Sequence, residues 1–465
     1  MDLGPGQMTD VAIHRRLFAV VTMKDSDKPN VNPGRLVAVA GNLVVNSIEV
    51  GPGPDHVEIS RSGKFAVIAC EGSTPEDDPT DGEFCPTELL PALLEELGDF
   101  NGDGEVNDAD LEDALAGVAA DDGEAIAALE DAAGDAAKAV DQAGSIDIVD
   151  LRRGPRRMEV VARVTAGDMF DLMVSRAEEA GEDAKTIKSR AKKAKNVEPE
   201  FVALGPDSDF ALVTLQEQSA VAVVDLEAIE DLLDDDDDSL TPEEIGAAAL
   251  VDVVLLPHGV KDSKGKRRGT HPDGIDISPD GDFAITANES KKTIQHLQGI
   301  SILDLSEGLE NIEVVATYCI FDLDPTLLDG TDLTECPPLG DFPEVPDPDD
   351  PGATIPGPAV KGLPRLDPED IAILEVDDTL VAAVAIERKA KDEDRGSVLF
   401  LDVTDALDGA FPEKIDRKLV GFNKKAAPEI VTPVRSKGRD FVFVSIEKDD
   451  GTIARIPVDE DDGDD

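Results

Sequence analysis

The sequence predicts an all-β fold, a β-propeller of six or seven four-stranded blades with small helical insertions. Three observations predict it: a strand phrase that recurs along the chain, strands rich in Val and Ile, and turn residues between these strands. Each copy begins with Pro and an acid, continues through two apolar strands, reaches a Glu, and ends with a third strand. Sheets that cannot bury both faces alone are stable when they stack around an axis.

The copies follow one another along the whole chain. The first, from VAIH to LVVNSIEV, lacks the acids, and the next five begin at Pro54, Pro199, Pro272, Pro368 and Pro428. Fourth strands are visible at 158–164 and 312–318, whereas the last copy lacks its outer strand. Separate β-sandwich domains would also supply such strands, but they rarely share one turn phrase and lack a repeated Pro-acid start. We therefore expect one propeller over residues 9–465.

Three segments interrupt the repeat. Residues 73–143 separate the second and third strands of the second copy and are expected to form an inserted helical segment. Residues 169–196 have an apolar start and a charged, Ala-rich continuation, which predicts a helical insertion. Residues 336–365 are rich in Pro and acids and are predicted to form a surface loop.

The inserted segment contains a loop with the spacing of a calcium-binding EF-hand. Gly104 occupies the sharp turn and Val106 the apolar anchor position. Ca²⁺ takes about 6–8 oxygen ligands at about 2.3–2.6 Å, and we predict calcium as a cofactor held here. An Asx-rich turn without an ion is the alternative. The predicted metal ligands are Asp99, Asn101, Asp103, Glu105, Asn107 and Asp110.

This loop resembles the dockerin type of EF-hand, which has Asp at its last position. Dockerins pair two such loops, and the other candidate here, residues 234–244, lacks the turn Gly. We therefore predict that 234–244 is a solvated acidic loop and that the chain does not bind cohesin.

The acids of the repeat are predicted to converge on one mouth of the central channel, because strands one and two of a blade are antiparallel. At an effective dielectric near 20, two charges about 10 Å apart repel by roughly 1.7 kcal/mol. Protons, bases or divalent cations must relieve this repulsion, unless each Pro-acid pair instead caps amides of a neighbouring blade. The candidate cation or ligand site comprises Asp55, Glu71, Glu200, Glu217, Asp273, Glu289, Glu369, Glu387, Glu429 and Glu447, and the candidate anion clamp comprises Lys291, Arg388 and Lys448.

Several phrases carry a family resemblance: TLQEQSAVAVVDL, HPDGIDI, ITANES, AIERK and VLFLDVTD. With these phrases the sequence resembles the choice-of-anchor I family, a group of exported bacterial β-propellers similar to esterase-like and phytase-like propellers. The resemblance implies an extracellular or periplasmic protein and, through some relatives, a phosphoesterase activity.

Composition excludes several partners. Lys and Arg number 43 against 102 Asp and Glu, a net charge of −59, which argues against nucleic acids and anionic membranes. The sequence contains no run of about 18 apolar residues, so it predicts no membrane-spanning helix.

Disulfides between Cys70 and Cys85 and between Cys319 and Cys336 are compatible with export, although four cysteines allow three pairings and free thiols.

We predict a secreted, calcium-binding propeller that acts as a binding or scaffold module through its acidic channel mouth. Divalent cations, with a small anionic or phosphorylated ligand, are the expected partners. The alternative is a metal-dependent phosphoesterase. The sequence contains no nucleophile elbow and no phosphate-binding Gly loop, so it leaves open whether the chain is an enzyme.

The calcium loop can be tested by removing two of its ligands. Asp99→Ala combined with Asp103→Ala should abolish one tight calcium site in isothermal titration calorimetry, because two carboxylates leave the coordination shell. An unchanged stoichiometry would contradict the prediction.

Overall fold

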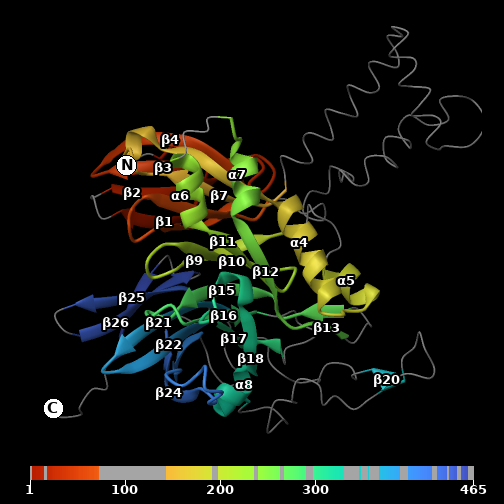
Figure 1. Cartoon of the computed structure of the whole chain (residues 1–465). Helices are drawn as coiled ribbons and strands as arrows, with labels where there is room; N and C mark the ends of the chain where they lie inside the picture. The colour runs from red at the N-terminus through yellow and green to blue at the C-terminus, as the bar shows by residue number, and fades with distance from the viewer. Residues whose placement is uncertain are drawn as a thin grey trace, which may run out of the picture.

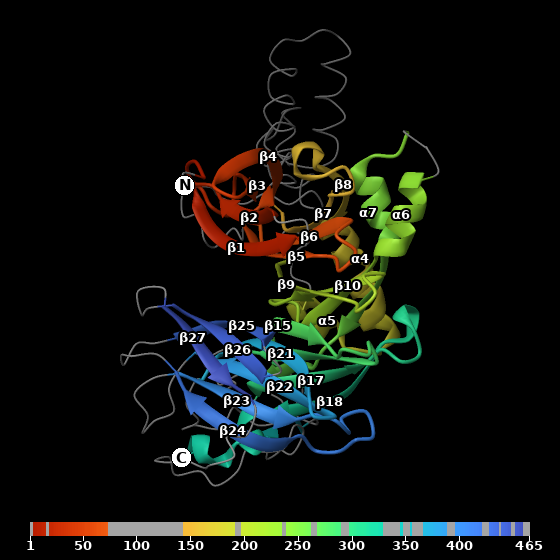
Figure 2. The same cartoon turned by 90° about the vertical axis from the view of Figure 1, so that its left-hand side faces the viewer.

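The computed structural model describes residues 3–14, 18–72, 143–190, 197–234, 239–261, 267–289, 297–328, 345–346, 354–355, 366–387, 396–420, 427–436, 439–447 and 452–458. Within these ranges the chain forms a six-bladed β-propeller (Figures 1 and 2). Five blades are four-stranded antiparallel sheets in chain order, and the last has three strands. The predicted fold class is confirmed, with six blades.

Each blade takes its strands consecutively from the chain. Blade 1 contains β1 (Gln7–His14), β2 (Phe18–Lys24), β3 (Pro33–Ala40) and β4 (Leu43–Pro52). Blade 2 contains β5 (Pro54–Ile59), β6 (Phe65–Cys70), β7 (Ser145–Asp150) and β8 (Glu159–Thr165). Blade 3 contains β9 (Pro199–Leu204), β10 (Phe210–Leu215), β11 (Ala220–Asp225) and β12 (Leu250–Leu255).

The second half repeats this order. Blade 4 contains β15 (Pro272–Ile277), β16 (Phe283–Asn288), β17 (Gly299–Asp304) and β18 (Glu313–Cys319). Blade 5 contains β21 (Pro368–Val376), β22 (Thr379–Ile386), β23 (Ser397–Asp402) and β24 (Glu413–Leu419). Blade 6 contains β25 (Ala427–Ser436), β26 (Arg439–Glu447) and β27 (Thr452–Pro457). The first strands of successive blades contact one another, so they are the innermost strands of the ring.

Short helices and hairpins lie between successive blades or between two strands of one blade. The helices are α4 (Ala166–Glu179), α5 (Ala184–Arg190), α6 (Leu226–Asp234), α7 (Pro242–Ala249) and α8 (Ile320–Leu323), with 3₁₀ turns η2 (Pro155–Arg157), η5 (Leu309–Asn311) and η6 (Pro325–Leu328). Two small hairpins pair β13 (His258–Lys261) with β14 (Arg267–Gly269) and β19 (Val345–Pro346) with β20 (Thr354–Ile355).

Two sequence predictions about these insertions have different outcomes. The predicted helical insertion at 169–196 contains most of α4 and all of α5, which are separated at Gly181, where φ is 74°, and its residues 191–196 lie outside the described residues. The prediction that 234–244 is a solvated loop is wrong at its end, because Thr241 caps α7. The Thr241 hydroxyl accepts a hydrogen bond from the Glu244 amide, and the Glu244 carboxylate accepts one from the Thr241 amide. Residues 73–142 of the predicted insert lie outside the described residues.

In blades 2 and 4 a serine side chain satisfies the amides of the polar turn between the first two strands. The Ser60 hydroxyl accepts hydrogen bonds from the amides of Lys64 and Phe65, and Ser278 does the same for Phe283. Gly63 in the first of these turns has a φ of 72°, a conformation that costs glycine little. These turns lie at the end of each blade opposite the Pro-acid start.

Apolar side chains seal five successive seams between blades. One hydrophobic cluster spans blades 1 and 2, another blades 2 and 3, and three more span the seams as far as blade 6. The seam between blades 2 and 3 also buries Met169 and Met173 of α4 and Ile245 of α7. A Cβ atom on Gly246 of α7 would lie 2.1 Å from the Arg163 carbonyl oxygen of β8, so only glycine permits this close approach.

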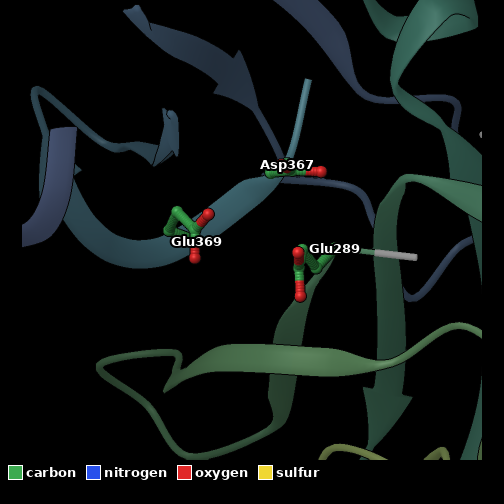
Figure 3. A group of neighbouring side chains, drawn as sticks. All are labelled: Glu289, Asp367 and Glu369. Carbon is green, nitrogen blue, oxygen red and sulfur yellow. The ribbon is translucent and has the colours of Figure 1, made fainter. Parts of the chain in front are cut away.

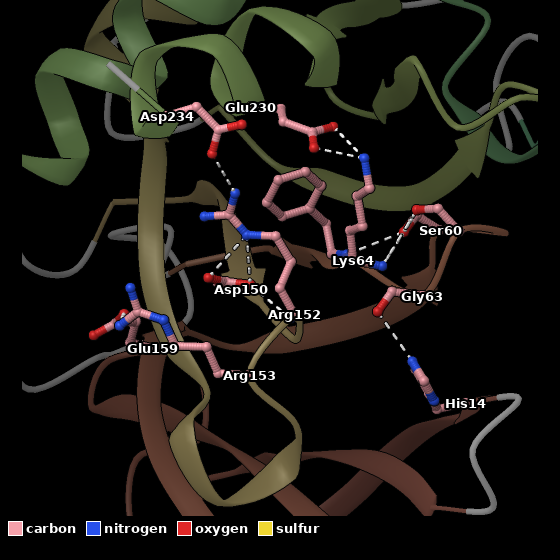
Figure 4. A network of polar contacts seen from close by, with 12 residues as sticks. His14, Ser60, Gly63, Lys64, Asp150, Arg152, Arg153, Glu159, Glu230 and Asp234 are labelled. Atoms are coloured by element: carbon pink, nitrogen blue, oxygen red, sulfur yellow. Dashed lines mark hydrogen bonds and ion pairs between the residues drawn. The ribbon is translucent and has the colours of Figure 1, made fainter. Parts of the chain in front are cut away.

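Ion pairs fasten blade 2 to its neighbours at the end opposite the Pro-acid starts (Figure 4). The Lys64 ammonium lies 2.5 Å from the Glu230 carboxylate of α6, and Arg152 bridges Asp150 and Asp234. These contacts hold α6 against the blade 2 turn.

A second set of contacts crosses the seams inside the channel. Acids of the first strands accept hydrogen bonds from amides of the next first strand: Asp10 from Val57 at 2.9 Å, Glu58 from Leu204 at 3.1 Å, Asp276 from Ile373 at 2.6 Å and Asp370 from Val431 at 2.8 Å. We call these four the lock acids. Burial raises the pKa of Glu58 to about 8 and that of Asp276 to about 7. For these two acids the effect of burial outweighs that of the amide hydrogen bond, so the protonated form is the one favoured in the fold.

Glu58→Gln should make the propeller less sensitive to alkaline pH. The pKa of Glu58 is raised in the folded state, so its contribution to stability is complete below its unfolded pKa of about 4.3 and is lost as the pH rises to about 8. Because Gln keeps an oxygen for the Leu204 amide, the variant should gain about 2 kcal/mol relative to the wild type between pH 5 and pH 8. Urea unfolding at both pH values measures this, with the exposed Glu310→Gln as the matched control. An equal stability difference at both pH values would contradict it.

Candidate functional site

The inner acids of the predicted site occupy one structural position in five blades. Each follows the proline that begins the first strand, and the strand register shifts just there in every one of these blades. Proline is tolerated at a strand start, and a bulge redirects the side chain. The repeated bulge turns the same position toward the axis in five blades, and the inner acids are Asp55, Glu200, Asp273, Glu369 and Glu429.

These acids follow one another around the mouth, as the sequence predicts. Glu200 shares a side-chain hydrogen bond with Asp55, and Glu369 shares one with Asp273. The charge of Glu200 acts on Asp273, and that of Glu429 acts on Glu369, so the series is continuous from blade 2 to blade 6.

Crowding keeps protons on the middle of the series. Burial, followed by neighbouring carboxylates, raises the pKa of Glu200 and of Glu369 well above the usual range. Burial also raises the pKa of Asp273, although the hydrogen bond from Glu369 opposes this. Two carboxyl groups that share a hydrogen bond hold one proton between them. The mouth therefore retains exchangeable protons near neutral pH.

The outer acids stand directly after the second strand in three blades. The amides of Glu71, Glu289 and Glu387 donate hydrogen bonds to the carbonyl oxygens of the residues before the prolines, at 2.9, 3.0 and 2.9 Å. Glu447 pairs with Ala427 at the corresponding place in blade 6.

Blade 3 departs from the predicted pattern by one residue. Gln216, not Glu217, makes the equivalent bond, to the Glu198 carbonyl oxygen at 3.1 Å. The assignment of Glu217 to the outer position is therefore wrong, because the turn after β10 begins one residue earlier than the sequence alignment suggests. The Gln216 side-chain amide donates to Glu289 at 3.4 Å, while Glu217 lies 3.6 Å from His271.

The residues before the prolines adopt an unusual backbone conformation. Gly53, His271 and Asp367 have φ of 58°, 51° and 46°, a left-handed region that is costly for His and Asp. Such strained positions cluster at functional sites and persist only where the surroundings impose them. Asp367 lies beside the outer acid of blade 4, Glu289, and the inner acid of blade 5, Glu369.

Three carboxylates form the group at the mouth best suited to a metal ion (Figure 3). One oxygen each from Glu289, Asp367 and Glu369 lies within 4.8 Å of the other two. Glu289 follows β16, whereas the other two flank Pro368 at the start of β21. The sequence analysis predicted Glu289 and Glu369 but missed Asp367, although the phrase Asp-Pro-Glu offered a signal.

A lysine that the sequence analysis missed neutralises the other side of the mouth. The Lys24 ammonium lies 3.0 Å from Asp55 and 3.1 Å from Glu71. Burial lowers the pKa of Lys24, but the two carboxylates outweigh it and hold the pKa above the usual value. Lys24 ends β2 at the position that Glu71 occupies after β6, so aligning VTMK with IACE would have identified it.

Other predicted residues are not part of the mouth as the structure describes it. The calcium-loop ligands and the anion clamp of Lys291, Arg388 and Lys448 lie outside the described residues. The possible Cys70–Cys85 disulfide is wrong, because Cys70 is a free thiol buried against Gly51 and Ser145. Cys319 is disulfide-bonded, so a pairing with Cys336 stays a prediction.

Lys24→Met should destabilise the propeller through the charges it leaves behind. Asp55 and Glu71 would lose their counter-charge, which should cost about 1–3 kcal/mol at pH 7 and less at pH 4, where carboxylates are protonated. Urea unfolding measures the loss. Lys64→Met is the matched control, since that ion pair with Glu230 lies at the other end of the blade. Equal losses for both variants at both pH values would contradict a special role for the mouth.

Comparisons with solved structures find likenesses of low identity. A periplasmic gluconolactonase of Pseudomonas aeruginosa is 11% identical, with 97% of this chain and 86% of that chain covered and a TM-score of 0.44. A putative 6-phosphogluconolactonase of Bacteroides uniformis is 9% identical over 97% and 86% of the two chains, with a TM-score of 0.41. The sequence has no significant match among curated proteins.

The comparison with family models identifies one domain. Its span begins in the predicted insert and ends in α6 of blade 3. The resemblance that the strand phrases predict is confirmed: residues 113–231 of this six-bladed β-propeller match the choice-of-anchor I domain.

Proposed function

We propose that the protein is an exported binding module whose channel mouth takes up a divalent cation, with calcium the first candidate. The three carboxylates of Glu289, Asp367 and Glu369 would supply the protein ligands. The cation would then present open coordination positions at the mouth to an anionic group of a partner.

The spacing of the three carboxylates is the observation that carries this proposal. Oxygens that bind one Ca²⁺ at about 2.3–2.6 Å can lie no more than about 5 Å apart. The oxygens of Glu289, Asp367 and Glu369 lie within 4.8 Å of one another, inside that limit. Carboxylates are the ligands that hard divalent cations prefer.

The protonation of the mouth supports the same proposal. Burial and the neighbouring acids Asp273, Glu289 and Glu429 raise the pKa of Glu369. A divalent cation would replace this proton as the counter-charge, so binding would release protons and strengthen as the pH rises. The blade 2 side would not compete, because Lys24 already neutralises Asp55 and Glu71.

A binding role is favoured over the phosphoesterase alternative. Phosphate transfer would require bases that hold the phosphate beside the metal. Lys24 is engaged by two carboxylates, and the predicted clamp of Lys291, Arg388 and Lys448 lies outside the described residues. Within the described ranges, no observation favours the enzymatic role.

Export is proposed from the domain match. The choice-of-anchor I domain at residues 113–231 suggests an exported protein, where calcium is abundant and disulfides persist. Across the described ranges, no helix has the length and apolar character needed to cross a bilayer.

Calcium titration of ligand variants tests the proposed site. In a background carrying Asp99→Ala and Asp103→Ala, Glu289→Gln with Glu369→Gln should weaken the remaining calcium site at least about tenfold. Calorimetry in two buffers of different ionisation enthalpy should show proton release for the background protein. Glu375→Gln, at the exposed far end of β21, is the matched control. Calcium binding of equal strength in the ligand variant would contradict the proposal.

A further inference from the structure

The third strand of blade 6 lacks the partner that the corresponding strands of the other blades have. In blades 1 to 5 the third strand pairs with an antiparallel fourth strand, whereas among the described residues no strand pairs with the outer edge of β27. The Val458 amide donates a hydrogen bond to the Asp440 carbonyl oxygen at 3.0 Å, and this bond sets the alternation of the β26–β27 ladder. The backbone N–H and C=O groups of Ile453 and Arg455 therefore point away from β26, toward this outer edge.

The third strand of blade 6 also has an uncovered side chain. One position of each third strand faces the following blade, and it pairs with the residue two places before Lys24, Glu71 and their equivalents. Ile453 of β27 is 67% exposed at this position. In blades 1 to 5 the equivalent side chains are fully buried, and they are Leu36, Ile146, Val221, Ile300 and Val398.

The first strand of blade 1 is uncovered on the facing side. Val11 of β1 occupies a position that faces the preceding blade, and it is 49% exposed. The equivalent side chains of blades 2 to 6 are 2–5% exposed, and they are Val57, Val202, Ile275, Ile371 and Val431. Both sides of the seam between blades 6 and 1 thus expose an apolar side chain that the other seams bury (Figure 2 shows the two blades, β1–β4 and β25–β27).

The charge of blade 6 at this edge is opposite to that of the chain as a whole, which has 43 basic and 102 acidic residues. Asp440 is buried and lies 3.5 Å from Arg435. The Arg455 guanidinium lies 3.7 Å from the centre of the Phe441 ring, on the same face of β27 as Ile453. Apart from the mouth acids, the exposed charged side chains described on β25–β27 are all arginines, namely Arg435, Arg439 and Arg455. This edge therefore suits an acidic partner.

Two other occupants fit the edge less well. A second copy would place two β27 edges together, and both the net charge of −59 on each copy and the Arg455 on each edge would oppose that pairing. The residues that follow Val458 in the chain, DEDDGDD, include no apolar side chain that would cover Ile453.

We propose that an extended acidic segment of a partner protein adds to β27 as the fourth strand of blade 6. Its backbone pairs antiparallel with Ile453 and Arg455, as the fourth strands do in the other five blades. Residues opposite these two positions share the seam face, so the segment has an acid opposite Arg455 and, two residues later, an aliphatic side chain that covers Ile453. This docking surface does not involve the mouth and does not depend on the cation proposed there.

Binding of a synthetic peptide tests the docking surface. The probe is a fluorescein-labelled peptide with the central residues Thr-Glu-Thr-Ile-Thr, and fluorescence anisotropy reads its binding to the full chain in EDTA. It should bind, and Arg455→Glu should weaken binding at least about tenfold, because the variant opposes one acid with another. A peptide with Lys in place of Glu should bind this variant more tightly than it binds the unaltered chain. Arg153→Glu, at a 65% exposed arginine of blade 2, is the matched control and should change neither affinity.

Hydrogen exchange tests whether the peptide pairs as a strand. The amides of Ile453 and Arg455 should exchange at least about tenfold more slowly when the peptide is added. Ile453→Thr alters an exposed side chain, so the chain should fold normally and bind the peptide at least about threefold more weakly. This variant keeps the proposal testable if Arg455→Glu loosens blade 6 through its contact with Phe441.

Several results would overturn the proposal. Absence of peptide binding to the unaltered chain is one, and equal losses for Arg455→Glu and Arg153→Glu would show only a general attraction of charges. Protection of the two β27 amides before peptide is added would mean that the chain covers its own edge. A dimer in sedimentation equilibrium that blocks the peptide would mean that a second copy does. Because the measurements are made without divalent cations, none of these results bears on the function proposed for the mouth.

Discussion

Crowding of carboxylates at one end of the channel is the constraint on which the mouth depends. A repeat that places an acid after the first proline of five blades must bring those acids together when the blades form a ring. The chain offsets the unfavourable proximity of these acids in two ways. Lys24 supplies a permanent counter-charge to Asp55 and Glu71, whereas Glu200, Asp273 and Glu369 retain protons. A bound lysine cannot leave, but a proton can be exchanged for a cation. The mouth therefore has one side where the counter-charge is a fixed lysine and another side where protons can be exchanged for a cation.

Acidic residues deeper in the channel have a different role from the acidic residues at the mouth. The lock acid Asp276 accepts one hydrogen bond from the Ile277 amide of its own strand and another from Ile373 of the next blade. Asp370 is bonded in the same manner to Ile371 and Val431. Coordination of a metal by these oxygens would break contacts between blades. At the mouth, the candidate ligand Glu369 instead shares a hydrogen bond with another side chain, that of Asp273 in the neighbouring first strand.

The blades and the inner acids could be predicted because they depend on local patterns. The Pro-acid start, the two apolar strands and the turn recur in the same order, and ring closure then fixes where the acids meet. The remaining parts depend on exact register. A shift of one residue in the turn after β10 replaces Glu217 by Gln216, and Asp367 lies at the site with a φ of 46°. A turn of altered length has no signal in residue type alone, and the phrase Asp-Pro-Glu places Asp367 next to an inner acid without giving its dihedral angle. Whether Cys70 forms a disulfide likewise depends on which side of β6 faces Ser145.

Blade 1 shows how one departure from the repeat has several consequences. Its Thr9 and Lys24 replace both acids, which ends the acidic series and pairs a lysine with two of the mouth acids, Asp55 and Glu71. The apolar residues that seal other seams are nevertheless present, since Val11 and Ile453 keep the residue types of their buried equivalents. Exposed strand positions in this acidic chain could be polar without loss of packing, so large aliphatic side chains there indicate a surface suited to burial. The two faces therefore match the chemistry of the sealed seams, where the equivalent side chains are buried.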